Sequence, residues 1–393
     1  MNLPPPDFHD LVLLGGGHAN IQLLKKFAMK PVPGVRLTLI TDVLHAPYSG
    51  MLPGYLAGFY RFDEIHFDLV KVAGKAGVRL LHQAAKSVDP RSKTVALNEG
   101  RHVAYDTLAI NAGCVPILPE QCDPAVVLPL KPISGFLKGW HKLLERLKKA
   151  DAPQFLAVVG GGAAGCEIAA ILQNEARKQN SRSRVLLVEK GHTLLPSLPQ
   201  TLQQKMQDKV QALGVEVLLG QEVVAASPGK LLLRSGGERK IDCALWATGA
   251  DAPQVVKTSE LPKDERGFVR VDATLAVSGE PDIFAVGDCV AFPGGLPKAG
   301  VFSVRQGGVL EENIRRKLRG QALRPYLPQT SFLSLITAGD KSAYASRGQY
   351  WGGGRLWWRW KDKIDRKFMQ RWQDFPPMTS QALSPQGTPI TRN

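Results

Sequence analysis

Two passages of the chain share one pattern of apolar and polar positions. In residues 11–20, LVLLGGGHAN, a short apolar run meets three glycines, and a second apolar run, VRLTLITD, follows at 35–42. Residues 155–172, FLAVVGGGAAGCEIAAIL, repeat this arrangement and are followed by RVLLVEK at 184–190. An apolar run, a glycine turn and a helical pattern are typical of a buried strand that enters a parallel βαβ unit. The pattern predicts an α/β fold with two dinucleotide-sized units, and hence two nucleotide cofactors.

Three further apolar runs end in turns of small residues. They are YDTLAINAGC at 105–114, CALWATGAD at 243–251 and IFAVGDCV at 283–290. Residues 296–308, LPKAGVFSVRQGG, read as a loop before a helix at 307–318, and alternation over 327–348 predicts a small sheet. The end of the chain, 376–393, has the composition of a flexible tail.

Composition limits the class of protein. With 393 residues, 44% apolar and 22% charged, the chain fits a globular protein of roughly two to three domains. Lysine and arginine total 50 against 35 acidic residues, and this net charge of +15 favours an anionic partner. The five cysteines lack CxxC or zinc-finger spacing, so we expect no disulfide scaffold and no metal site. Without an apolar run of ~18 residues or a signal-peptide pattern, a cytoplasmic location is expected.

The second glycine loop has the features of a dinucleotide site. Gly160, Gly162 and Gly165 satisfy GxGxxG directly after an apolar run. These positions allow a tight turn, the approach of a pyrophosphate, and close packing of helix on strand. Glu189 ends the next apolar run, where a carboxylate accepts hydrogen bonds from an adenosine ribose and repels a 2′-phosphate. The loop therefore favours NADH over NADPH, although the adjacent Lys190 weakens that preference.

The first loop is less regular. Gly15 and Gly17 fit the pattern, but Asn20 holds the third glycine position, and Asp42 is displaced from the place of a ribose-binding acid. An ordinary strand–helix turn is the alternative for this loop. The distant Asp288 favours a flavin site, because an aspartate at the end of IFAVGD is well placed to hydrogen-bond a ribityl chain.

GGGH, the NAG turn, GGGAAG, ATG and FAVGD occur in one order, over roughly residues 10–318. In this the chain resembles the two-dinucleotide-domain flavoproteins, which include the pyridine nucleotide–disulfide reductases, type II NADH dehydrogenases and sulfide:quinone reductases. HAPYSGMLPGYLAGFY and LPKAGVFSVRQ are similar to the NADH dehydrogenase-like branch often joined to selenophosphate synthase. The resemblance implies an FAD enzyme with two Rossmann-like domains, and a functional link to selenophosphate synthase is a further hypothesis.

The resemblance also implies a division of the chain. A discontinuous FAD domain would comprise 1–119 and 262–325, with an NAD(P)H domain inserted at 120–261, a C-terminal segment at 326–375 and the tail after it. Hydride would pass from nicotinamide to flavin between the domains, and the protein would supply geometry and electrostatics. The cofactor-binding residues implied are Gly15, Gly17, His18, Ala19, Asp42, Tyr48, Ser49, Ala112, Gly113, Gly160, Gly162, Gly165, Glu189, Thr248, Gly249, Gly287, Asp288 and Lys298.

The resemblance narrows the electron acceptor. Residues 48–58 correspond to the stretch that carries the cysteine pair of the disulfide reductases, and they contain no cysteine. Type II NADH dehydrogenases need none, and Glu167 matches the glutamate of their GxGxxGxE pattern. Lys298 and Gln306 match their segment beside the flavin pyrimidine, where a cation would stabilise the reduced flavin. These three residues are the catalytic candidates, but Val301 replaces the first glutamine of the AQxxxQ quinone motif.

The region from Trp351 to Trp372 is basic and aromatic. It holds five of the seven tryptophans and seven Lys or Arg against two Asp. On a helical wheel one sector gathers the apolar residues Leu356, Trp360, Ile364, Phe368 and Trp372, and most basic residues lie opposite. This pattern predicts an interfacial helix on an anionic membrane, with packing on its own domain or on a second copy as the alternatives. Nucleic acid is not an expected partner.

The sequence thus predicts an FAD-dependent NADH dehydrogenase that reduces a quinone-like acceptor as a peripheral protein on the inner face of a membrane. One alternative is a soluble NAD(P)H reductase of a small redox protein or of a sulfur or selenium compound. Another is a flavin-binding regulatory protein. A homodimer is left open.

Overall fold

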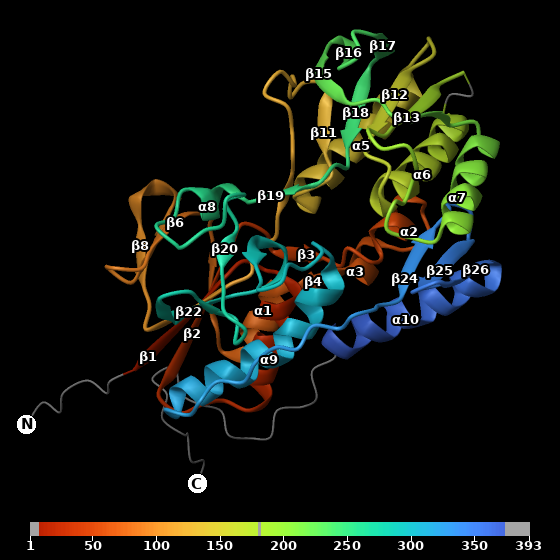
Figure 1. The fold of residues 1–393 in the computed structure, drawn as a ribbon. Coiled ribbons are helices and arrows are strands. Elements are labelled where there is room, and N and C mark those ends of the chain that lie inside the picture. The colour runs from red at the N-terminus through yellow and green to blue at the C-terminus, as the bar shows by residue number, and fades with distance from the viewer. Residues whose placement is uncertain (1–7, 180–181, 374–393) are drawn as a thin grey trace, which may run out of the picture.

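The computed structural model describes residues 8–179 and 182–373, and the predicted tail at 376–393 lies outside them. Two parallel sheets organise the chain (Figure 1). In the first sheet, of six strands, the order is β21 (Ala276–Val277), β22 (Glu280–Ala285), β9 (Thr107–Ile110), β1 (His9–Leu14), β2 (Val35–Thr41) and β5 (Arg79–His82). Its pairs are parallel apart from the edge pair β21–β22.

The second sheet is wholly parallel. Its five strands are ordered β11 (Val127–Pro129), β18 (Cys243–Trp246), β12 (Phe155–Val159), β13 (Arg184–Val188) and β14 (Glu216–Leu218). The middle strands β12, β13 and β18 are almost wholly buried, which explains why they read as uninterrupted apolar runs rather than as alternating ones.

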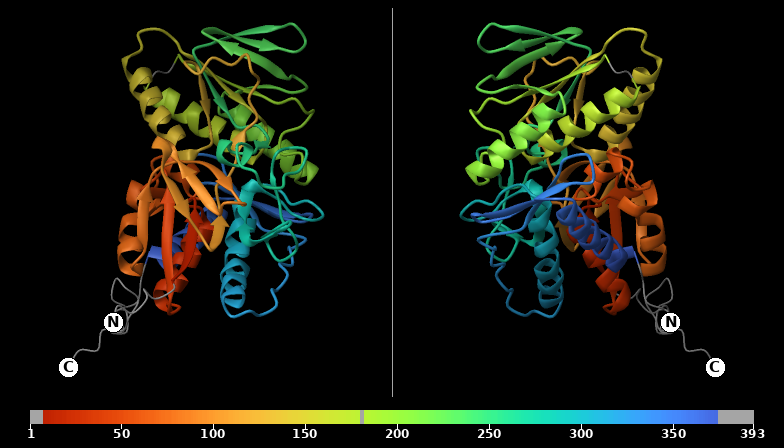
Figure 2. Two further views of the ribbon diagram at one scale, coloured as in Figure 1. Left: turned by 90° about the vertical axis from the view of Figure 1, so that its left-hand side faces the viewer. Right: turned by 90° about the vertical axis from the view of Figure 1, so that its right-hand side faces the viewer.

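Segments distant in sequence build the lower part of the molecule together. In Figure 2 the red and orange N-terminal third interleaves there with the cyan region near residue 300, and the yellow and green middle of the chain forms the upper part. The predicted fold, two Rossmann-like units of which the first is discontinuous, is confirmed. The residue numbers given for the domain boundaries stay predictions.

Smaller sheets and the helices complete the fold. The antiparallel sheets are β6 (Ala85–Asp89), β7 (Thr94–Leu97) and β8 (His102–Ala104); β15 (Val223–Ser227), β16 (Gly229–Leu233) and β17 (Glu238–Ile241); and the predicted C-terminal sheet, β24 (Ser334–Thr337), β25 (Ala343–Arg347) and β26 (Tyr350–Gly354). Two-stranded pairs are β3 (His45–Pro47) with β4 (His66–Asp68), β10 (Val115–Pro116) with β19 (Ala250–Asp251), and β20 (Val269–Arg270) with β23 (Val290–Ala291). The helices are α1 (His18–Met29), α2 (Leu52–Leu56), α3 (Phe62–Ile65), α4 (Leu69–Ala76), α5 (Ile133–Lys149), α6 (Ala163–Gln179), α7 (Gln200–Ala212), α8 (Gln254–Lys257), α9 (Gly300–Leu318) and α10 (Arg355–Gln373).

Helix α9 begins earlier than the sequence suggests. The prediction of a loop over 296–308 was wrong from Gly300 onward, because the helix already includes the glycine-rich part of that segment. Close packing explains the glycines: a Cβ at Gly307 would lie 3.0 Å from the Cα of Ala19 on α1. Glycine here lets two helices approach each other, so it does not mark a break in the helix.

Helix α10 lies along the lower part of the molecule (Figure 1) and packs on α1, α3, β4 and the C-terminal sheet. Lys361, Asp365 and Met369 face the protein and are buried. The predicted single apolar face is divided: Phe368 and Trp372 pack against the core of the first sheet, whereas Leu356, Trp360 and Ile364 are exposed. None of the helices in residues 8–179 and 182–373 has an apolar stretch of the length needed to span a bilayer.

Candidate functional site

A cavity of about 490 Å³ opens at the carboxyl ends of the first sheet's strands. Ligands in open parallel sheets bind at this edge. Its walls include the first glycine loop, the turn after β9 and the N-terminus of α9. Residues 131–134, which follow β11 of the second sheet, and residues 253–255, at the start of α8, complete it. Of the residues predicted from the sequence, it is lined by Gly15, Gly17, His18, Asp42, Ser49, Ala112, Gly113 and Asp288.

The first glycine loop is built against Asn111, at the end of β9. Gly15 has φ +93°, and a Cβ there would lie 2.5 Å from the Asn111 carbonyl oxygen. A Cβ at Gly17 would lie 2.1 Å from the Asn111 side-chain oxygen. That oxygen accepts a hydrogen bond of 3.1 Å from the Ala19 amide, and the Asn111 amide group donates to Val286 O at 3.0 Å. Asn111 therefore holds together the loop, the strand end and the turn before Asp288. Sequence reasoning identified the turn but not this side chain.

Asn20 substitutes for the third glycine by hydrogen bonding. Its side-chain nitrogen donates to the carbonyl oxygens of Leu14 at 3.1 Å and Gly15 at 2.9 Å, with a longer contact to Ala109 at 3.4 Å. The residue is fully buried. The amide thus satisfies backbone carbonyls at the point where α1 leaves the sheet.

His18 lies in the cavity wall at the start of α1. Its ring contacts Tyr48 and Phe67 edge-on, at centroid distances of 5.5 and 6.2 Å. Within the described part of the chain its buried Nε2 has no hydrogen-bond partner. Burial lowers the pKa of His18 to about 4, so the ring is neutral at pH 7. A buried, unpartnered ring nitrogen and a loop that leaves no room for a Cβ are features that fit a bound FAD.

Asp288 is paired with a lysine that the sequence reasoning did not single out. The Lys131 ammonium lies 2.7 Å from Asp288 Oδ2 and 3.1 Å from the Sγ of Cys114. Burial lowers the pKa of Lys131, but the neighbouring Asp288 and Cys114 outweigh it and the net shift is upward. Burial raises the pKa of the Cys114 thiol, so Cys114 is not an activated nucleophile. Both Cys114 and Lys131 line the cavity.

Two predicted flavin contacts, Lys298 and Gln306, lie behind the residues that line the cavity. The Lys298 ammonium donates to Val290 O and sits 3.8 Å from the ring centroid of Phe268, and burial lowers its pKa. Gln306 is buried, and its side-chain oxygen accepts the Gly287 amide hydrogen at 2.7 Å. In this structure both residues support the turn that carries Asp288, and neither is among the residues that line the cavity.

The second glycine loop is crowded at its first and third glycines and open at its second. Gly160 has φ +110°, and a Cβ there would lie 2.6 Å from the Ala247 carbonyl oxygen. A Cβ at Gly165 would lie 1.7 Å from Gly160 O, so α6 packs directly on the loop. Within the described residues, a Cβ at Gly162 would meet no atom within 4 Å. That open position is where the pyrophosphate approaches in the predicted role of this glycine.

Glu189 is fixed by the loop beside it. Its two carboxylate oxygens accept hydrogen bonds from the amides of Gly161, at 2.5 Å, and Gly191, at 2.7 Å. Thr248 donates its hydroxyl hydrogen to Ile117 O at 2.7 Å, next to Gly249 in the turn after β18. The carboxylate is therefore held at the end of β13, where a ribose-binding acid belongs.

Glu167 lies in the first turns of α6 and faces the C-terminal sheet. Its Oε1 accepts hydrogen bonds from the Thr337 amide at 2.8 Å and from the Thr337 hydroxyl at 3.2 Å. Burial raises the pKa of Glu167 to about 7, despite the opposing charge of Lys361. A carboxyl group with such a pKa can hold or release a proton near neutral pH.

Helix α10 holds the loop beside the cavity. The Lys361 ammonium lies 2.6 Å from Gly50 O and 2.5 Å from Asp365 Oδ2. The Tyr48 hydroxyl donates to Asp365 Oδ1 at 3.3 Å, and Phe368 stacks on the Tyr48 ring at a centroid distance of 4.5 Å. Tyr48 does not line the cavity, but the adjacent Ser49 does. The contacts of α10 with Tyr48 therefore fix the position of the loop that contains Ser49.

Known proteins are similar to this chain in sequence or in fold. The chain is 23% identical over 340 residues to the NADH dehydrogenase-like protein YutJ of Bacillus subtilis, covering 85% of this chain and 90% of that protein. It is 29% identical to the demethylphylloquinone reductase NdbB of Synechocystis, covering 70% and 71%. The structure of NDH2 from Plasmodium falciparum in complex with NADH superposes with a TM-score of 0.78 at 16% identity, covering 94% and 99%.

A family model described as pyridine nucleotide-disulphide oxidoreductase matches residues 9–307. This match agrees with the extent of the resemblance and confirms the expectation of an oxidoreductase. It also confirms the expected cofactor pair, FAD with NADH. Since the match covers most of the chain, the protein belongs to the pyridine nucleotide-disulphide oxidoreductase family.

Proposed function

We propose that the protein is an FAD-dependent NADH dehydrogenase that delivers electrons to a quinone-like acceptor at a membrane surface. When bound, FAD accepts hydride from NADH and passes the electrons on. The protein's residues bind and orient the two cofactors: the loop of Gly15 and Gly17, with Asp288, would hold FAD. Gly162 and Glu189 would hold the pyrophosphate and ribose of NADH.

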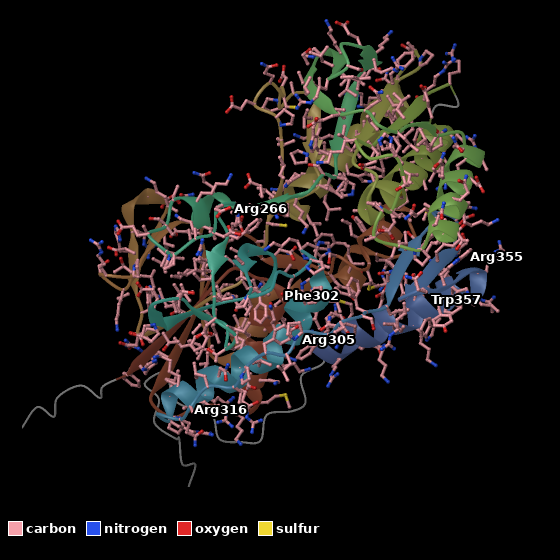
Figure 3. The ribbon with its side chains drawn as sticks, in the orientation of Figure 1. Arg266, Phe302, Arg305, Arg316, Arg355 and Trp357 are labelled. Atoms are coloured by element: carbon pink, nitrogen blue, oxygen red, sulfur yellow. The ribbon has the colours of Figure 1, made fainter. Side chains whose placement is uncertain are left out.

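The outer face of α10 carries the membrane part of the proposal. Leu356, Trp360 and Ile364 are spaced four residues apart and are 75%, 43% and 36% exposed. Exposed basic residues flank this stripe: Arg355, Arg359, Lys363, Lys367 and Arg371. Arg355 and Trp357 lie at the end of α10 next to β26 (Figure 3). Aliphatic and tryptophan side chains beside lysine and arginine suit the boundary of an anionic bilayer, where each cation adds about 1 kcal/mol.

The inner face of the same helix supports the choice of acceptor. It packs through Asp365 and Phe368 on Tyr48, next to the wall of the cavity. A surface that enters the headgroup region would therefore bring the cavity close to a lipid-soluble acceptor. NdbB is named as a reductase of demethylphylloquinone, a quinone, which agrees with this choice.

Glu167 is the proposed proton-holding group. Reduction of a quinone takes up two protons with two electrons, and a carboxyl group with a pKa near 7 suits that task. In the described structure Lys361 and Asp365 are its charged neighbours. Lys298 and Gln306 remain proposed as contributors to the flavin environment, through the turn at Gly287.

The membrane proposal is tested by Leu356→Glu, Trp360→Glu and Ile364→Glu together. We expect this variant to lose binding to vesicles containing anionic lipid, while NADH-to-ferricyanide activity stays normal because the three side chains are exposed on α10 and do not line the cavity. Leu327→Glu is the matched control, since Leu327 is 82% exposed and lies outside α10. Equal vesicle binding by the triple variant and the wild type would remove the membrane from the proposal.

The acceptor is tested by anaerobic mixing with NADH, followed by separate additions of quinones and soluble acceptors. We expect NADH to bleach the flavin absorbance and a quinone to restore it. Restoration only by a small redox protein or a sulfur or selenium compound would favour the soluble reductase. A flavin that NADH does not bleach would favour the regulatory protein. The homodimer, the inner-face location and the link to selenophosphate synthase stay predictions.

A further inference from the structure

The charges around the cavity are unevenly distributed. Asp42, Asp288 and Lys131 are the charged residues among the described side chains that line it. His18 adds no charge at pH 7, because its pKa is lowered to about 4 by burial. Lys298, the lysine expected here from the sequence, directs its ammonium to Val290 O and the ring of Phe268. Among the residues that the structure describes, Lys131 is therefore the one cation in this wall.

Lys131 and its partner Asp288 follow strands of different sheets. Lys131 follows β11 of the second sheet and precedes α5, whereas Asp288 follows β22 of the first sheet. The pair has an N–O distance of 2.7 Å, and its lysine side chain is 38% exposed. This exposure and its place in the cavity wall leave the lysine side chain accessible to a bound cofactor.

We propose that Lys131 is a positioning residue that sets the reduction potential of bound FAD, by neutralising Asp288 at the wall of the cofactor cavity. Hydride brings two electrons and one proton to FAD, so the flavin gains one negative charge unless a second proton follows. A fixed cation stabilises that charge, and an unpaired Asp288 would oppose it. Lys131 keeps its proton throughout.

The raised pKa of Lys131 supports a fixed charge over the physiological range. Without Lys131 the described wall would hold two carboxylates and no cation, a strongly unfavourable setting for an electron-rich flavin. The inference rests on FAD occupying this cavity, as proposed above. It differs from the expectation for Lys298, because it assigns the cation to the segment that follows β11 of the second sheet.

The test is the midpoint potential of FAD bound to Lys131→Met, measured by equilibration with a reference dye. We expect the ratio of reduced to oxidised flavin at a given dye potential to fall at least tenfold, which is 29.6 mV for a two-electron couple. Lys131→Arg should restore most of the ratio. Lys93→Met is the matched control, because Lys93 pairs with Asp282 at 2.6 Å away from the cavity and should leave the ratio unchanged.

A second variant covers the case in which Lys131→Met does not fold or retain FAD. Asp288→Asn removes the negative charge but keeps a side chain that can hydrogen-bond FAD, so the ratio should shift toward reduced flavin, and the absence of a shift would count against the inference. The inference would be overturned if Lys131→Met bound FAD with an unchanged ratio of reduced to oxidised flavin, or if the ratio in Lys131→Arg were as low as in Lys131→Met. Either result would leave the assignment of this cavity to FAD unaffected. A wild-type protein that takes up no FAD on reconstitution would instead overturn the proposed function.

Discussion

The two glycine loops begin alike and diverge at corresponding positions. Gly15 and Gly160 both adopt positive φ, and both abut the carbonyl of the residue that follows the neighbouring strand, Asn111 or Ala247. The second glycine of each pattern has different surroundings. Gly17 is crowded by the Asn111 side chain, whereas the position corresponding to it in the second loop, Gly162, is open. The packing of the protein itself requires glycine at position 17, whereas the described residues leave room for a side chain at position 162.

The comparison extends into the helices that follow. Helix α6 packs on its glycine loop through Gly165. Helix α1 instead uses the Asn20 side chain, which donates hydrogen bonds to the backbone carbonyls that face it. Two residues further, Gln22 donates to Val304 O of α9 at 2.9 Å, and Glu167 accepts from Thr337 of β24. Matching positions thus fasten each helix to a later segment, but only Glu167 introduces a group that titrates.

The largest contrast should come from Gly17→Ala against Gly162→Ala. At Gly17 the added methyl group would overlap the Asn111 side chain, so we expect the unfolding free energy to fall by about 3 kcal/mol, with loss of FAD. At Gly162 the methyl group meets open space, so stability should change by less than about 0.5 kcal/mol. NADH binding should still weaken at least tenfold.

Denaturant unfolding, FAD content and NADH titration measure these effects. Equal losses of stability in both variants would mean that the loops are constrained in the same way. Full NADH affinity in Gly162→Ala would remove that residue from the pyrophosphate site.

Local patterns explain which parts were predictable. The loops, the strand ends and Asp288 were found from the sequence because each depends on a few adjacent residues whose spacing reports the turn. Asn111 and Lys131 were not, since their roles depend on partners such as Val286 and Asp288 that are more than 150 residues away. A polar residue at the end of an apolar strand, as at Asn111, was the available signal.

The burial of individual side chains on α10 could not be predicted from the sequence, because it depends on how the helix packs. A helical wheel places Trp360 and Phe368 in one sector, but it carries no information on where the protein ends and solvent begins. Tyr48 and Lys25 cover the later turns of α10, and the earlier turns extend beyond them. The resemblance placed Lys298 beside the flavin, and the structure turns its ammonium toward Phe268.

Asn20→Gly would give the first loop the regular GxGxxG pattern and should nevertheless destabilise it. The variant loses an amide that serves buried carbonyls and adds a flexible glycine to a helix, a cost of about 2 kcal/mol. Lys205→Gly, on the exposed face of α7, controls for helix propensity and should cost about 1 kcal/mol. If Asn20→Gly were as stable as the wild type, packing alone would hold α1 on its strand.

The smallest expected effect is the pH dependence of the unfolding free energy. Glu167 in α6 should contribute to it, whereas Gln22, at the matching position of α1, should not. The folded pKa of Glu167, about 7, lies above its ordinary value of 4.5, so folding binds a proton between these values. Its stabilising contribution is complete below pH 4.5 and is lost as pH rises through 7, at about 1 kcal/mol between pH 6 and 8. Glu167→Gln should remove this slope and keep the Thr337 contact, whereas Gln22→Glu should introduce a similar slope in the first unit. If the unfolding free energy changed equally between pH 6 and pH 8 in the wild type and in Glu167→Gln, Glu167 would be ionised over this whole range. That result would end its role as the proton-holding group.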